Sequence, residues 1–325
     1  MITNELSEAV AMTAKNPALR QCPFCAETHP ALFLTAPDRF HGREKEYELL
    51  RCSSCSLVWL NAPPAPPEMG EHYGEEYDRT IAIAAKAPDH WYAPRDVLFR
   101  YKSGGSVLDL GCASGGFLST VKGPAWQLFG IEMSEEAAEI ARHRCGAQVF
   151  VGDILDAHFP RASFDAITCF NVFEHVYEPQ KVLARVAEWL KPGGIFIAAM
   201  PNIDSAGERI FRSYWYGLEL PRHLYHFSPK TLRMVAESVG LHEISLSTAR
   251  CLHFESSMRY VVDNLVKKIG ISRPPLSRAT EPGIAFKVVR KIFRMTFLNL
   301  FSASAFLIGD GEVINAVFTK PDASQ

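Results

Sequence analysis

From about residue 96 onward, apolar residues occur in short runs that polar or amphipathic stretches separate. Runs of this length that end near a glycine or an acid predict buried strands, and the stretches between them predict helices. Their alternation favours an α/β fold with a largely parallel sheet. An amphipathic helix is predicted from Asp89 to Lys102, before the first strand. The five strands are predicted at Ser106–Leu110, Gln127–Ser134, Gln148–Gly152, Phe164–Phe170 and Ile195–Met200.

The stretch from Ser106 to Phe117, SVLDLGCASGGF, carries the first strand into a glycine turn. Glycines 111 and 115 permit positive φ and lack the Cβ that would hold a ligand away, so backbone N–H groups can approach a ligand here. The motif G-x-G-x-x-G is absent, and the order is D-x-G-C-x-x-G, starting at Asp109. The second strand ends in Glu132, a little over twenty residues later, where a βαβ unit places an acid on a ribose diol.

The glycine turn, the acid-ended strands and the sequence L-K-P-G-G at 190–194 occur together. In this combination the chain resembles the class I S-adenosylmethionine-dependent methyltransferases, from about Asp96 to Pro321. The resemblance implies a Rossmann-like sheet of seven strands whose last two, Leu241–Thr248 and Glu312–Thr319, form an antiparallel edge. A nicotinamide-binding Rossmann domain is the alternative, because its first βαβ unit would look alike. Dehydrogenases, however, usually show G-x-G-x-x-G at this turn.

The same resemblance implies a binding site for the cofactor, S-adenosylmethionine. Glu132 would accept the ribose hydroxyls, and Asp153 would take the adenine amino group. The alternatives are a solvated carboxylate at the strand end for Glu132 and a helix N-cap for Asp153. The implied cofactor residues are Asp109, Gly111, Cys112, Gly115, Glu132, Met133, Asp153, Ile154 and Asn171.

Two C-x-x-C knuckles near the start, Cys22–Cys25 and Cys52–Cys55, predict a zinc ribbon in which four thiolates hold a structural Zn²⁺. Unligated thiols or a redox pair are the alternatives. The apolar run at 57–60 is expected to dock the ribbon on the main domain, and the proline-rich stretch Asn61–Pro67 to form a stiff extended connector. We expect the remaining cysteines to pack as small apolar residues: Cys112, Cys145, Cys169 and Cys251.

Acceptor recognition is predicted in the aromatic loop before Ser228 and Pro229, which themselves read as an N-cap and first residue of a helix reaching Ser238. The loop sequence P-R-H-L-Y-H-F-S-P at 221–229 resembles a loop of zinc-ribbon-bearing bacterial methyltransferases often found near cell-surface polysaccharide genes. It resembles more loosely a loop of the quinone-ring O-methyltransferases. Each histidine could instead fix the shape of the loop or cleft. The candidate catalytic residues are His223, His226 and His175, and the candidate substrate-binding residues are Tyr214, Trp215, Tyr216 and Arg222, the last as an anion clamp.

The length of 325 residues favours one α/β domain with a smaller module. The first twenty residues lack the basic and apolar segments of a signal peptide, so a cytoplasmic protein is expected. The predicted parts are a tail at 1–20, the zinc ribbon at 21–60, a linker with lead-in helices at 61–95, and the methyltransferase domain at 96–325 with a helical insertion at 252–309.

These features predict methyl transfer to an oxygen or carbon of a small-molecule or glycan/lipid-linked acceptor. An RNA methyltransferase whose ribbon grips RNA is the first alternative, although a net charge of −2 gives no global basic field. A cofactor-binding scaffold without turnover is the second. The apolar, basic stretch 284–308 predicts either a helical cover or dimer interface or a helix at the inner membrane surface.

Overall fold

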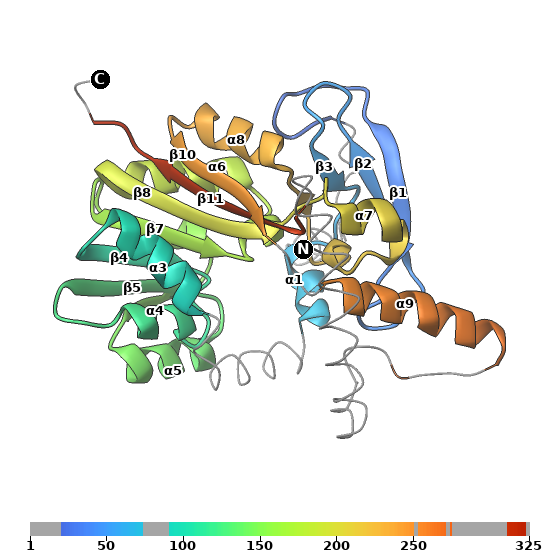
Figure 1. The fold of residues 1–325 in the computed structure, drawn as a ribbon, viewed down its shortest axis with the longest axis horizontal. Helices are drawn as coiled ribbons and strands as arrows, with labels where there is room; N and C mark the ends of the chain where they lie inside the picture. Colours follow the sequence, from blue (N-terminus) through green and yellow to red (C-terminus); the bar gives the residue numbers. More distant parts are fainter. Residues whose placement is uncertain (1–20, 74–90, 250–252, 271–273, 275–310, 323–325) are drawn as a thin grey trace, which may run out of the picture.

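Seven strands form the larger of two sheets in the computed structural model, which describes residues 21–73, 91–249, 253–270, 274 and 311–322 (Figure 1). Their order across the sheet is β10-β11-β8-β7-β4-β5-β6, and β11 is antiparallel to both of its neighbours. The predicted α/β sheet with its antiparallel edge is therefore confirmed. The strands are β4 (Gly105–Leu110), β5 (Trp126–Glu132), β6 (Gln148–Val151), β7 (Phe164–Phe170), β8 (Leu190–Pro201), β10 (His242–Ala249) and β11 (Val313–Thr319).

Helices cover both faces of this sheet (Figure 1). Val107 of β4 packs in one core cluster with Leu98 and Phe117, whereas its neighbour Leu108 packs in the other with Leu183 and Val235. Successive side chains of a strand point to opposite faces, so the apolar run of β4 is buried on both sides. The first face holds α3 (Tyr92–Tyr101), α4 (Gly116–Val121) and α5 (Glu135–Cys145), and the second holds α6 (Pro179–Trp189) and α8 (Pro229–Ser238).

The ends of the predicted elements differ little from the observed ones. Helix α8 begins as predicted, with Ser228 as its N-cap and Pro229 as its first residue. Strand β8 starts at Leu190, five residues before the predicted Ile195, because Leu190 already pairs with Phe164 of β7. The start of the predicted helix at Asp89 lies outside the described residues.

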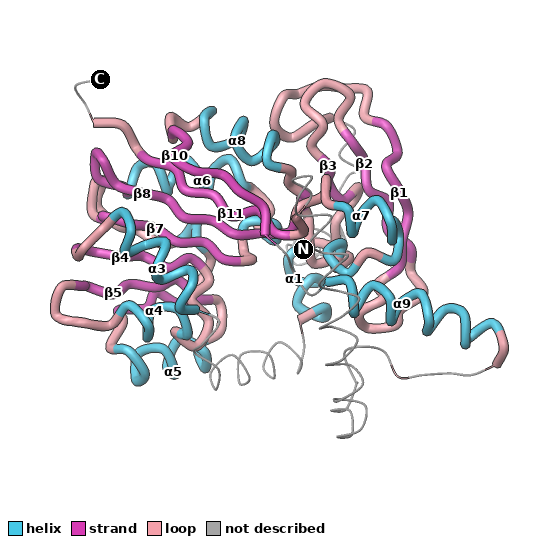
Figure 2. The backbone as a smooth tube through the Cα atoms, viewed as in Figure 1, coloured by secondary structure: helices cyan, strands magenta, loops and turns pink. Residues whose placement is uncertain are grey.

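The smaller sheet has the order β1-β2-β3-β9, with antiparallel neighbours throughout. Figure 2 shows β1, β2 and β3 grouped beside the larger sheet. Strands β1 (Ala31–Pro37), β2 (Glu46–Arg51) and β3 (Val58–Leu60) come from the predicted ribbon, whereas β9 (Tyr225–His226) comes from the aromatic loop. Val58 pairs with His226, and Trp59 with Tyr225. The run at 57–60 thus docks the ribbon on the rest of the chain, as expected.

The prediction of an extended connector from Asn61 to Pro67 was wrong for its last two residues. A short helix, α1 (Pro66–Met69), begins there and continues into η1 (Gly70–His72). Proline is tolerated in the first turn of a helix, because the N–H that it lacks would have no partner there.

Several short elements surround the aromatic loop. They are η3 (Ile154–Asp156), η4 (Phe173–His175), α7 (Ala206–Phe211), η5 (Arg212–Tyr214) and η6 (Tyr216–Leu218). Helix α9 (His253–Lys268) opens the predicted insertion, but Cys251 and the stretch 284–308 lie outside the described residues. Within the described part of the chain, no helix has the length and apolar character needed to cross a membrane.

Candidate active site

The glycine turn after β4 has the backbone conformation that its sequence predicts. Gly111, Ala113 and Gly115 have φ values of +69°, +44° and +71°. A Cβ placed on Gly111 would lie 2.4 Å from Cγ2 of Val172. Only glycine fits this position without displacing its neighbour, so the turn packs directly against the segment that follows β7.

Glu132 stands at the end of β5 with its carboxylate aimed at this turn. Its Oε2 accepts a hydrogen bond from the backbone N–H of Ala113 (2.9 Å), and its Oε1 accepts one from that of Ser134 (2.9 Å). The side chain is buried, whereas the neighbouring Met133 is 69% exposed. The turn, a fixed carboxylate and an accessible apolar side chain are thus adjacent, which fits the diol and the flat base of a nucleoside.

Asp109 lies at the base of the turn and is buried. Burial raises the pKa of its carboxyl to about 7, and the negative charge of Glu132 adds to this effect, while a hydrogen bond that Thr168 Oγ1 donates to Oδ1 (2.7 Å) opposes it. Thr168 was not among the predicted residues. It is a polar residue among the apolar residues at the end of strand FDAITCF, and that position was the available signal.

We expect Asp109→Asn to increase the free energy of unfolding at pH 8 by roughly 2–4 kcal/mol, and by much less at pH 4.5. The raised pKa means that the fold favours the protonated form. The group therefore contributes its full stability below the unfolded pKa, and this contribution is lost as the pH rises towards and past 7. Urea unfolding at both pH values measures the difference, with the exposed Asp156→Asn as control. An effect of Asp109→Asn independent of pH would contradict this assignment.

The other predicted cofactor residues lie at the ends of neighbouring strands. Asp153 is exposed after β6, and its Oδ1 accepts a hydrogen bond from Leu155 N (2.8 Å), so it also caps η3. Asn171 is exposed after β7 with φ +54°. Ile154 is buried, and Cys112 packs against Gly130 of β5. Because β4 to β7 are parallel, all of these residues meet at the carboxyl edge of the sheet, where open α/β sheets bind ligands.

A second group of polar side chains is buried next to this edge, around η4. The rings of His175 and His223 lie 4.6 Å apart between centroids, and those of His223 and His226 lie 6.1 Å apart. His175 Nδ1 is 3.1 Å from the carbonyl oxygen of Arg222 and 3.0 Å from the hydroxyl of Tyr73. His223 Nδ1 is 2.9 Å from the carbonyl oxygen of Gly217. The structure thus brings the three candidate catalytic histidines together.

Burial sets the charge state of this group. It lowers the pKa of His175 and of His226 to about 3, with smaller contributions from neighbouring histidines, and it lowers the pKa of His223 well below its ordinary value. Burial also raises the pKa of Glu174 to about 8. All three histidines are therefore neutral near pH 7, and burial disfavours their protonated forms unless a bound group compensates.

The candidate substrate-binding residues surround these histidines. Arg222 forms an ion pair with Glu219, and its guanidinium lies 4.4 Å from the ring centre of Phe40 in the β1–β2 loop. Trp215 is almost fully buried. Tyr214 is covered by the Arg39 guanidinium at 3.8 Å, and Tyr216 stacks on Tyr260 at 6.0 Å. The positive charge of Arg222 is therefore already paired with Glu219. The β1–β2 loop, through Arg39 and Phe40, contacts two of the candidate substrate-binding residues. Neither Glu219 nor Phe40 was predicted to belong to the site.

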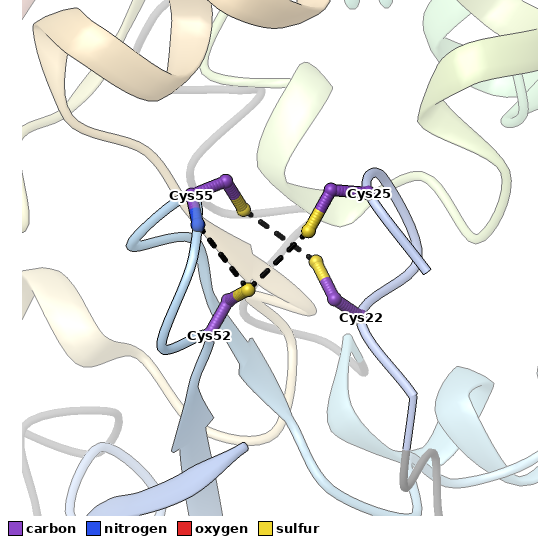
Figure 3. A group of neighbouring side chains, drawn as sticks. All are labelled: Cys22, Cys25, Cys52 and Cys55. Atoms are coloured by element: carbon purple, nitrogen blue, oxygen red, sulfur yellow. Dashed lines mark hydrogen bonds between the residues drawn. The ribbon is translucent and has the colours of Figure 1, made fainter. Parts of the chain in front are cut away.

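The four knuckle cysteines converge at the other end of the ribbon (Figure 3). The sulfur atoms of Cys22 and Cys55 are 3.6 Å apart, and those of Cys25 and Cys52 are 3.4 Å apart. A tetrahedral site with Zn–S bonds of about 2.3 Å has sulfur atoms about 3.8 Å apart, so this cluster is compatible with one Zn²⁺. Cys112, Cys145 and Cys169 are buried apart from it, as expected.

Comparison with known sequences decides the family. Residues 84–246, half of the chain, match the family described as a methyltransferase domain. The chain belongs to this methyltransferase family. It is a class I S-adenosylmethionine-dependent methyltransferase, and the seven-stranded sheet described above is the fold of that class.

Relatives of this methyltransferase include an O-methyltransferase named for ubiquinone biosynthesis. It is 30% identical over 163 residues to a ubiquinone biosynthesis O-methyltransferase of Azoarcus sp. (strain BH72), which covers 45% of this chain and 67% of the relative. It is 34% identical over 111 residues to an uncharacterized 37.1 kDa protein in a transposon of Streptomyces fradiae, covering 32% of each. The methyltransferase thus spans about a third of the Streptomyces protein and about two thirds of the Azoarcus enzyme.

A solved structure supports the fold. A complex between the Haloferax volcanii Trm112 methyltransferase activator and a methyltransferase matches 77% of this chain and 98% of the matched chain. The TM-score is 0.50 at 21% sequence identity. This similarity concerns the fold alone.

Proposed function

We propose that this methyltransferase transfers a methyl group from S-adenosylmethionine to an oxygen or carbon of a small-molecule acceptor, free or linked to a glycan or lipid. The observation that carries this proposal is the contact between the two halves of the site. Gly111 of the cofactor turn packs against Val172, and Glu174 and His175 follow at once. The segment that packs on the proposed cofactor turn therefore also carries His175, so the two halves of the site are adjacent.

The carboxyl edge of the sheet offers each group that the cofactor needs. Glu132 would hold the ribose hydroxyls, Met133 would cover the adenine, and Asp109 beside the turn would stand near the methionine ammonium. The bound cofactor supplies a methyl carbon activated by its sulfonium. The protein then has to align the acceptor with that carbon and, where the acceptor carries a proton, to remove it.

We assign the proton acceptor to His226. Its Nε2 is buried and has no hydrogen-bond partner in the part of the chain that the structure describes. In His175 and His223, Nδ1 faces a backbone carbonyl, and both residues belong to a group with Glu174 that does not include His226. His226 also lies on β9, whose pairing with β3 holds its backbone in place.

The choice of acceptor rests on charge and on relatives. A relative named for ubiquinone biosynthesis O-methylation favours a small molecule, and the Arg222–Glu219 pair leaves no unpaired cation for an anionic group at that position. RNA is disfavoured because the net charge is −2 and because β3 of the ribbon is occupied by pairing with β9. We further propose that the four cysteines hold a structural Zn²⁺.

The test combines methyl transfer with cofactor binding. Purified protein incubated with methyl-labelled S-adenosylmethionine and fractionated cell extract is expected to label one extract component. His226→Gln should lower the labelling rate at least about 100-fold, as expected for loss of a general base, and leave the cofactor Kd within about threefold. His143→Gln, a largely exposed histidine on α5, is the control. Full labelling by His226→Gln would overturn the assignment, and no cofactor binding by the wild type would overturn the function.

A further inference from the structure

Glu174, His175 and His223 form a buried group with the composition of a metal site. One ligand atom of each residue lies within 4.8 Å of the ligand atoms of the other two. Glu174 and His175 are adjacent on η4, and His223 comes from the loop between η6 and β9. Two imidazoles and a carboxylate on separate segments are a common ligand set for divalent transition metals.

Several acceptor atoms of this group receive no hydrogen bond from other described residues. Neither carboxylate oxygen of Glu174 has a hydrogen-bond partner among the described residues, although the residue is 2% exposed. Because a carbonyl oxygen can only accept, Nδ1 of His223 carries the proton towards Gly217, and Nε2 of the neutral ring keeps a lone pair. That Nε2 lies 3.3 Å from Glu219 Oε2, a second acceptor.

His175 repeats this arrangement. Its Nδ1 lies 3.1 Å from the carbonyl oxygen of Arg222 and 3.0 Å from the hydroxyl of Tyr73, which can accept as well as donate. With the proton on Nδ1, pointing at the carbonyl, the lone pair of the neutral ring lies on Nε2. Metal-binding histidines usually donate their second nitrogen to a carbonyl or carboxylate in this way, which fixes the tautomer and the ring orientation.

The second cluster of this composition, Asp38, His41 and His72, is different. There His41 Nδ1 lies 2.9 Å from Asp38 Oδ2, and Arg43 Nη1 donates to His72 Nδ1 at 2.9 Å. The guanidinium of Arg43 already supplies a positive charge at this cluster. The acceptor atoms of Asp38 and His72 already have hydrogen-bond partners. This cluster joins the β1–β2 loop to η1 and is no metal site.

We propose that Glu174, His175 and His223 bind a divalent transition metal ion, with Zn²⁺ or Mn²⁺ suiting the mixed nitrogen and oxygen ligands, as a second metal site apart from the four cysteines. Glu219 Oε2 is close enough to serve as a further ligand or to orient a bound water. The site itself does not depend on the proposed reaction. Its role does: an ion here would polarise the acceptor oxygen, so that His226 can remove its proton more readily.

Metal content tests the site without any measurement of activity. Full-length protein loaded with excess Zn²⁺ and passed over a desalting column is expected to hold two ions per chain by plasma mass spectrometry. Glu174→Gln and His223→Ala should each hold one, Cys52→Ser should hold one, and the double variant Glu174→Gln/Cys52→Ser should hold none. His41→Ala, in the Asp38 cluster, should still hold two.

Co²⁺ loading separates the two sites by spectroscopy. Cobalt on four thiolates gives strong sulfur-to-metal charge-transfer absorption, which Cys52→Ser should remove. The weaker bands of a nitrogen and oxygen site should remain in that variant and disappear in Glu174→Gln. Melting curves and cofactor affinity near wild type would show that Glu174→Gln is folded.

Three outcomes would overturn the second site. One is a single ion in the wild type that Cys52→Ser removes. Another is a second ion that both Glu174→Gln and His223→Ala retain. The third is a second ion lost in His41→Ala and kept in Glu174→Gln, which would place it at Asp38. Two ions in a protein that shows no methyl transfer would support the site while contradicting the proposed function.

Discussion

Cys52→Ser is expected to lose the ribbon zinc and at least about 100-fold of the methyl-transfer rate, while the Kd for S-adenosylmethionine stays within about threefold. A four-thiolate zinc site contributes folding free energy directly, and small zinc modules unfold without their metal. Loss of the metal loosens β3, to which β9 and therefore His226 are hydrogen-bonded. His175 and His223 are held instead by the carbonyl oxygens of Arg222 and Gly217, outside the smaller sheet. The cofactor residues lie on the other sheet, at the ends of β4 to β7. Metal analysis, initial rates and calorimetry with the cofactor measure the three quantities.

Cys145→Ser is the matched control. Cys145 is also buried, but it lies on α5, far along the chain from the knuckles, and its Sγ donates a hydrogen bond to the carbonyl oxygen of Ala141 (3.2 Å). It should keep both zinc and activity. If Cys52→Ser lost its zinc and remained fully active, the ribbon would not position His226.

The parts of this structure that could be predicted from sequence depend on local chemistry. β4, β5 and β7 are short, mostly apolar segments because they are largely buried on both faces, and such segments are visible in the sequence. The glycine turn was visible because positive φ at Gly111 restricts the residue type. The C-x-x-C spacing indicated the thiol cluster because two thiolates on one tight turn need that spacing.

The parts that could not be predicted depend on contacts distant in sequence. β9 has only two residues, so it has no periodicity, and it exists because β3 offers an edge to Tyr225 and His226. Glu219 has φ +38° in a loop, and nothing in the sequence relates it to Arg222 as an ion-pair partner. The buried Asp38, held by His41, is likewise defined only by the folded loop. The assignments of individual site residues and of domain boundaries stay predictions.

The pairing of β3 with β9 also changes the interpretation of the ribbon. The edge of the ribbon at its last strand is not available to another molecule, because β3 pairs with the loop that carries the proposed base. Its other end, the loop at 39–40, covers Tyr214 and lies against Arg222. The ribbon therefore contacts the proposed acceptor-binding residues from two sides, which fits a structural role within the proposed site.

Glu132→Ala is expected to weaken binding of S-adenosylmethionine, and of its demethylated product, by at least about 100-fold. A carboxylate that accepts two ribose hydroxyls makes two charge-assisted hydrogen bonds, each contributing about 1.5–3 kcal/mol, so that even the lower value for both exceeds a factor of 100. The substitution also releases the N–H groups of Ala113 and Ser134, which loosens the glycine turn. Calorimetry with both nucleosides measures the effect. Glu135→Ala is the control, because this neighbouring carboxylate is 70% exposed and pairs with Arg142 on the outer face of α5. A Kd unchanged in Glu132→Ala would mean that the ribose lies elsewhere.

Glu132→Gln separates the two contributions, because it keeps the size of the side chain but turns an N–H towards one of the two backbone donors. If the charge matters most, glutamine should lose nearly as much affinity as alanine; if the turn geometry matters most, it should recover part of the affinity.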